Sequence, residues 1–266
     1  WCTSRLSGAT RVYGVDFSGA AKGGQKIWIA SCELRDNLIH LIDCRPALEL
    51  PNGSANLLPA LAALRAVIAR AGESWWGFDF PFSLANAYMH GSTWQGFVTS
   101  FGARYPDVMD FRAMSLGWRG GRRNTDIETK TPFPPHNLRL FRQTYFGIRD
   151  VLAPLVASDQ VRVLPMQVAV AEKPRLLEIC PASTLKEERM YFPYKGSANR
   201  VGRERIWNWL LANGLQADAP RRILDDREGD ALDSVIAAWT VGRLILKRVQ
   251  LDARTELELR EGRVFL

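Results

Sequence analysis

Short apolar runs with strand character dominate the first part of the chain. They cover residues 12–15, 26–34 and 38–45, and each contains β-branched or aromatic residues bounded by turn residues. Asp36 and Asn37 separate the second run from the third, a residue pair that favours a tight hairpin. These patterns predict an opening β-meander of three antiparallel strands.

A helical pattern follows the meander. Residues 52–72 carry apolar side chains at helical spacing and stop at a glycine, whereas residues 74–82 read as a strand that Pro81 interrupts. Three strands, one helix and a further strand predict an α/β fold with a mixed sheet. The sheet would consist of the antiparallel meander and later α/β units, and helices would flank it.

The middle of the chain departs from this alternation. We expect a largely helical insertion over residues 83–159, with a basic, glycine-rich loop at 117–136 that is poorly packed. A strong amphipathic helix should follow that loop at 137–156. Its apolar positions are Leu138, Phe141, Tyr145, Ile148, Leu152 and Leu155. The α/β core then comprises residues 11–82 and 160–250, and residues 1–10 and 251–266 are terminal segments.

Composition limits the functional classes only weakly. The chain has 266 residues, a net charge of +7 and a pI of about 9.5, so a polyanionic partner is permitted. Its four cysteines are scattered without metal-ligand spacing, which argues against structural zinc and favours a reducing cytoplasm. No apolar run is long enough to span a bilayer, and the first residues lack a signal-peptide pattern. We therefore expect a cytoplasmic protein without a membrane partner, and the oligomeric state stays open between monomer and homodimer.

Acidic residues stand at comparable positions in several elements. Asp16, Asp79 and Glu178 each lie at or near the end of a predicted strand, and Asp230 and Asp233 open the helix at 229–243. Because sites in α/β sheets form beyond the carboxyl ends of strands, these acids can converge. Converging carboxylates need a cation between them, and Mg²⁺ prefers oxygen ligands.

The carboxylates therefore predict a site for one or, more typically, two Mg²⁺ or Mn²⁺ ions. Asp16 would lie at its centre as a shared ligand, Asp79 and Glu178 would bind from the sides, and Asp233 would bind from the helix. Which of Asp230 and Asp233 binds metal stays open.

Each acid also has a purely structural interpretation. An aspartate in the first turn of a helix complements the helix dipole, which would account for Asp230 and Asp233. Asp79 would form a turn before Pro81, and Glu178 would be an ion-pair partner of a nearby arginine. The metal-site hypothesis rests on the whole set and its order along the chain.

Four motifs resemble those of a known family. The motifs YGVDFSGA, WGFDFPF, LLEICPAST and GDALDSVIAAW are similar to the successive motifs of the predicted ribonuclease H-like nucleases. These are proteins of unknown physiological function in the ribonuclease H and Holliday-junction-resolvase superfamily. The resemblance covers about residues 11–80 and 160–245, and its Asp230-x-x-Asp233 pair is similar to the helix motif of the resolvase branch. It implies a ribonuclease H-like fold and a magnesium- or manganese-dependent site.

The expected function is a metal-dependent, nuclease-like phosphodiesterase acting on nucleic acid. Arg119, Arg122 and Arg123 of the basic loop, with Lys22, are the candidate phosphate-binding residues. One alternative is a sugar-kinase or actin-like enzyme that binds nucleotide phosphates with the loop at 16–24, which has small residues and a lysine. Another is a nucleic-acid-binding protein without catalysis. The sequence leaves the type of nucleic acid open.

Overall fold

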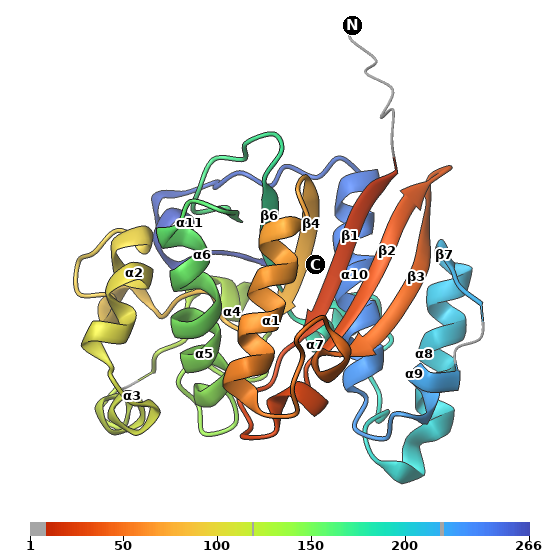
Figure 1. Cartoon of the computed structure of the whole chain (residues 1–266), viewed down its shortest axis with the longest axis horizontal. Helices are drawn as coiled ribbons and strands as arrows, with labels where there is room; N and C mark the ends of the chain where they lie inside the picture. The colour runs from red at the N-terminus through yellow and green to blue at the C-terminus, as the bar shows by residue number, and fades with distance from the viewer. Residues whose placement is uncertain (1–8, 119, 219–220) are drawn as a thin grey trace, which may run out of the picture.

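The computed structural model describes residues 9–118, 120–218 and 221–266. In these residues one mixed sheet of eight strands has the order β5-β6-β4-β1-β2-β3-β7, with β8 beside β6 (Figure 1). The strands are β1 Thr10–Asp16, β2 Trp28–Arg35, β3 Leu38–Pro46, β4 Ser74–Asp79, β5 Arg162–Leu164, β6 Pro174–Ile179, β7 Leu215–Gln216 and β8 Val264–Phe265.

Helices cover both faces of this sheet. They are α1 Leu57–Arg70, α2 Trp94–Arg104, α3 Val108–Ser115, α4 Asn124–Glu128, α5 Phe141–Gly147, α6 Ala153–Ala157, α7 Pro181–Glu187, α8 Arg200–Ala212, α9 Arg221–Asp225, α10 Asp230–Leu246 and α11 Glu256–Glu261. A π-helical segment, Ile148–Leu152, joins α5 to α6. In Figure 1, α1 lies in front of the sheet and α10 lies behind it.

The predicted meander is confirmed. β1, β2 and β3 pair antiparallel, and Asp36 and Asn37 turn the chain between β2 and β3 with φ angles of 53° and 61°. Positive φ at both residues is what a two-residue turn needs to match the right-handed strand twist. β4 and β6 then continue the sheet in parallel with β1. The α/β class with a mixed sheet flanked by helices is therefore correct.

A glycine allows the central strand and the longest helix of the described residues to touch. At Gly14, an added Cβ would overlap the backbone oxygen of Ser234 and the backbone nitrogen of Ala238. Only a residue without a side chain lets α10 pack this closely on β1. This contact brings the first turn of α10 close to the end of β1.

The segment predicted as an insertion is largely helical and shares its core with the sheet. Tyr145, Ile148 and Leu152 belong to the same buried cluster as Trp76 and Phe78 of β4. The expected amphipathic helix is present but begins later, at Phe141. Leu138 therefore precedes the helix and is 67% exposed, so its prediction as an apolar-face residue is wrong.

Among the described residues, no helix has the length and apolar character that crossing a bilayer requires. Cys32, Cys44 and Cys180 are free thiols, and Cys2 lies outside the described residues.

Candidate metal centre at the strand ends

Two of the predicted acids lie side by side because of strand register. Asp16 is the last residue of β1, Asp79 is the last residue of β4, and the two are paired in this parallel ladder. Residues level with each other on neighbouring strands point to the same face of a sheet. Gly14 and Gly77, two residues earlier on each strand, both face α10. The carboxylates therefore leave the sheet on the face that α10 covers.

The third acid comes from the helix. Asp233 lies in the first turn of α10, which the Gly14 contact holds against β1. Asp16, Asp79 and Asp233 each offer one carboxylate oxygen, and these oxygens lie within 4.8 Å of one another. Asp16 and Asp233 are buried and Asp79 is partly buried. Oxygen ligands at this spacing suit a hard divalent cation.

Two residues that the sequence analysis did not select contact this cluster. The Nζ atom of Lys195 lies 2.6 Å from an oxygen of Asp233 and 3.8 Å from one of Asp230. The hydroxyl of Tyr194 donates a hydrogen bond of 2.7 Å to the other Asp233 oxygen. Both residues lie in an irregular segment without apolar periodicity, so no local sequence pattern indicated that they belong to the site.

Negative charge exceeds positive charge in the cluster. Burial raises the pKa of Asp16 well above its ordinary value, and repulsion from Asp230 and Asp233 raises it further. Burial followed by repulsion from Asp233 raises the pKa of Asp79 to about 8. Burial raises the pKa of Asp230 to about 6, although Lys195 acts in the opposite direction. A bound cation would relieve both the desolvation and the repulsion of these carboxylates.

Glu178 lies apart from the three aspartates. It pairs in register with Phe78, one residue before Asp79, so its side chain leaves the opposite face of the sheet. Both carboxylate oxygens contact the guanidinium of Arg123, at 2.5 and 2.7 Å, and one also accepts the backbone N–H of Phe82. Glu178 is thus not one of the three carboxylates that lie within 4.8 Å of one another, although it lines the same pocket as Asp79 and Asp233.

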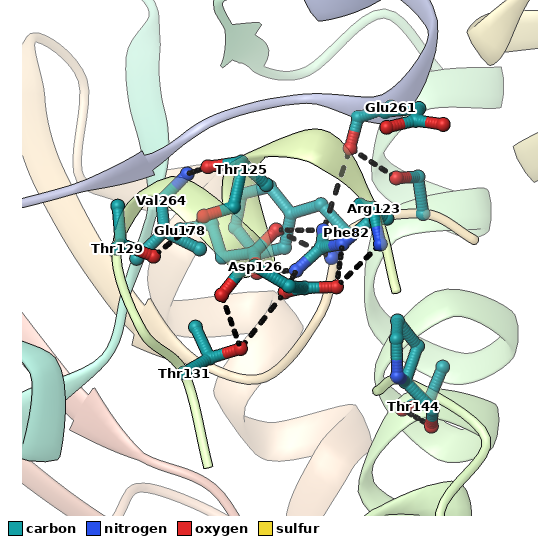
Figure 2. A network of polar contacts seen from close by, with 12 residues as sticks. Phe82, Arg123, Thr125, Asp126, Thr129, Thr131, Thr144, Glu178, Glu261 and Val264 are labelled. Atoms are coloured by element: carbon teal, nitrogen blue, oxygen red, sulfur yellow. Dashed lines mark hydrogen bonds and ion pairs between the residues drawn. The ribbon is translucent and has the colours of Figure 1, made fainter. Parts of the chain in front are cut away.

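Arg123 is an interior residue, which corrects its prediction as a phosphate-binding loop residue. Its side chain is 1% exposed and also pairs with Asp126, at 2.8 Å (Figure 2). Asp126 in turn accepts a hydrogen bond from Thr131. The backbone oxygen of Glu261 accepts a further bond from Arg123. The part of the predicted loop that forms α4 is therefore packed, because Arg123 and Asp126 lie buried against Glu178 near the end of β6.

Of the other three residues predicted to bind phosphate, the structure describes Arg122 and Lys22. Arg122 donates to the backbone oxygens of Thr131 and Pro132. Lys22 is exposed and donates to the side chain of Asn56. Arg119 lies outside the described residues.

Two pockets flank the aspartate cluster. The first, of about 640 Å³, includes Asp79 and Asp233 in its wall. The second, of about 410 Å³, includes Asp16, Asp79 and Asp230. Asp79, Arg139 and Lys195 line both. Lys26 and Arg142 add cationic groups to the second pocket, so basic side chains surround the acids there.

Comparison with known proteins adds no relative. No protein-family model, curated protein or solved structure matches the chain. Any functional conclusion therefore depends on the chain's own residues and their geometry.

Proposed function

We propose that this chain is a metal-dependent phosphodiesterase of the nuclease type. Asp16, Asp79 and Asp233 would hold one or two Mg²⁺ or Mn²⁺ ions. The observation that carries the proposal is the convergence of these three carboxylates within 4.8 Å, on a sheet edge where they repel one another. Burying like charges together is costly unless a cation binds between them.

The topology supports a ribonuclease H-like fold. The strands β3, β2, β1, β4 and β6 are consecutive in the sheet, the first three are antiparallel, and β1, β4 and β6 run in parallel. Of the four motifs that resemble the ribonuclease H-like nucleases, two end β1 and β4, one ends β6 and one begins α10; β1, β4 and α10 carry the clustered aspartates.

The side chains in and around the aspartate cluster would have distinct roles. Asp16 and Asp79 bind from the sheet, and Asp233 binds from α10. Tyr194, through its hydrogen bond, fixes the Asp233 carboxylate in orientation. Lys195 neutralises Asp233 in the free protein and would pair with a substrate phosphate when a metal takes that carboxylate. Metal ions bound by these residues would supply Lewis-acid stabilisation of a reacting phosphodiester.

Basic side chains at the second pocket support a nucleic-acid substrate. Lys26, Arg139 and Arg142 line this pocket beside Asp16 and Asp230. Cationic groups next to a metal site provide contacts for the phosphates that flank the reacting one. This assignment replaces Arg123, whose guanidinium is held by Glu178 and Asp126, and Lys22, which lines neither pocket.

Metal binding and cleavage test the proposal together. Mn²⁺ titration followed by calorimetry should show binding to the wild type and its loss in Asp16→Asn, which keeps the side-chain shape and removes the charge. The same variant should lose metal-dependent cleavage of labelled single-stranded, duplex and branched DNA and RNA. The matched control is Asp159→Asn. Asp159 is an exposed aspartate that pairs with Arg162 and Lys173 and lines neither pocket.

Three results would oppose the proposal. One is Mn²⁺ binding that is unchanged in Asp16→Asn, and another is cleavage that persists in that variant. The third is ATP turnover without phosphodiester cleavage, which would favour the kinase-like alternative. In that case the loop residues Ser18, Gly19 and Ala20, which line the second pocket, would be the phosphate-binding groups.

A further inference from the structure

The first pocket differs from the second in the character of its wall. Five aromatic residues line it, together with Asp79, Asp233 and Lys195 of the candidate metal centre. We call it the aromatic pocket. The rings are those of Phe80, Phe133, Tyr191, Phe192 and Tyr194.

Cations lie over several of these rings. The guanidinium of Arg139 is 5.4 Å from the centre of the Phe133 ring, and the ammonium of Lys186 is 5.1 Å from that of Tyr191. Arg205 covers Phe192 at 4.5 Å. Such pairing places positive charge beside flat apolar surfaces. The complementary ligand is a flat aromatic group attached to an anion.

Size and position narrow the ligand further. About 640 Å³ lies within the range of pockets that enclose small organic ligands, so a single base with its sugar fits and a base-paired duplex does not. Because Asp79 and Asp233 line the same pocket, a base inside it would belong to a nucleotide next to the reacting phosphate.

We propose that the aromatic pocket receives one unpaired nucleobase of the substrate. This inference rests on the proposed function, since the metal centre would hold the adjoining phosphate. The base stacks on the exposed ring of Tyr191 and on Phe133. Arg139, which lines both pockets, contacts the phosphate between them, and the next phosphate lies in the second pocket beside Lys26 and Arg142. The substrate is therefore a single strand or an extrahelical nucleotide.

Binding of base-bearing and abasic oligonucleotides tests this inference without catalysis. The probes are two short single-stranded DNAs, identical except that one carries 2-aminopurine and the other an abasic site at the central position. Measured in the Asp16→Asn variant with metal chelated, the base-bearing probe should bind about tenfold more tightly, a typical effect of stacking one base on an aromatic side chain. Its fluorescence should be quenched on binding.

Substitutions at Tyr191 separate stacking from folding. Tyr191 is 52% exposed, so Tyr191→Ala should leave the thermal unfolding midpoint unchanged. It should also reduce the preference for the base severalfold, whereas Tyr191→Phe retains the ring and should retain the preference. Leu138→Ala is the control, because Leu138 is exposed, adjoins Arg139 and does not line the pocket. 2-Aminopurine mononucleotide, added separately, distinguishes a free nucleotide ligand from a strand.

Equal binding of the two probes, or a preference that survives in Tyr191→Ala, would overturn the aromatic-pocket proposal. Wild-type protein that prefers the base but cleaves nothing with any metal would reject the proposed function and retain the pocket. Cleavage that is independent of the base would support the proposed function and reject the role of the aromatic pocket. Tight binding of the mononucleotide alone would show that the pocket serves a small-molecule substrate and would exclude a strand.

Discussion

Two buried acidic clusters lie at the ends of neighbouring strands, and their charges are balanced in different ways. At the end of β6, Glu178 and Asp126 share the guanidinium of Arg123, whose donors reach both carboxylates (Figure 2). At the ends of β1 and β4, the cluster of Asp16, Asp79 and Asp233 has an ion pair from Lys195 to Asp233. The first cluster is complete as a structural unit, whereas the second has room for a cation.

The two cations show the same contrast. The Arg123 side chain is 1% exposed, whereas that of Lys195 is 50% exposed. A guanidinium makes fixed, forked contacts with carboxylates, while an ammonium is a mobile point charge. We infer that Arg123 is a permanent partner and that Lys195 is an exchangeable one. Each of the following experiments perturbs one side of this comparison.

Removal of the permanent partner should have the largest effect on stability. Arg123→Ala leaves Glu178 and Asp126 buried without their cation, and breaking a buried pair in this way costs about 3–5 kcal/mol. Urea unfolding at neutral pH should show a loss of that size. Arg122→Ala serves as the control, since Arg122 donates to the backbone oxygens of Thr131 and Pro132, and it should cost about 1 kcal/mol. Equal losses in the two variants would contradict a structural role for the Arg123 cluster.

The aspartate cluster should make the metal-free protein less stable as pH rises. Folded Asp79 keeps its proton up to a pKa of about 8, whereas the unfolded residue loses it near its ordinary value of 3.8. The folded state therefore binds more protons between about pH 4 and pH 8, so the free energy of unfolding falls across that window and levels off above it. Asp230, with a pKa of about 6, acts in the same direction over the lower part of the window.

The expected decline is at most about 6 kcal/mol from Asp79, because its pKa shift spans about four units and one unit corresponds to about 1.4 kcal/mol. Urea unfolding in chelator at a series of pH values should measure it. Asp79→Asn should flatten the profile, and Mn²⁺ should restore stability at pH 8. In Asp159→Asn the profile should keep its slope, since pairing with Lys173 and Arg162 lowers the pKa of Asp159 to about 2, outside this window. A profile that rises from pH 4 to pH 8 would count against the buried, repelling cluster.

The sequence contained enough information to locate the aspartates. Asp16 and Asp79 each end an apolar strand, and parallel neighbours bring such ends to one edge of a sheet. Gly14 allows α10 to approach, which explains why the acids in its first turn lie near the site. The place of Asp233 beside Asp16 and Asp79 could thus be predicted from its position in the helix, whereas its membership of the three-carboxylate cluster in preference to Asp230 became visible only in the structure.

Glu178 shows what the sequence could not supply. Its side chain faces away from Asp79 because it is level with Phe78, and a shift of one residue in register would reverse that orientation. Local patterns do not determine register between strands so distant in sequence. Arg123 was misassigned for a related reason. Its partner Glu178 is 55 residues away, while its glycine and arginine neighbours suggested a solvated loop.

Removal of the exchangeable partner, Lys195, should lower stability less than the other changes do. It should also strengthen metal binding. Lys195→Met keeps much of the side-chain volume and deletes the charge that lies 2.6 Å from Asp233. Because the Lys195 side chain is half exposed, we expect a loss of only about 1 kcal/mol in the metal-free protein.

Mn²⁺ should bind more tightly to Lys195→Met, since the ion no longer competes with an ammonium for the same carboxylate. Calorimetric titration of Mn²⁺ would measure this gain, with Lys22→Met as the control, because Lys22 contacts Asn56 and lines neither pocket. Weaker Mn²⁺ binding in Lys195→Met would mean that the ammonium organises Asp233 for the metal, and the contrast with the permanent partner Arg123 would then be wrong.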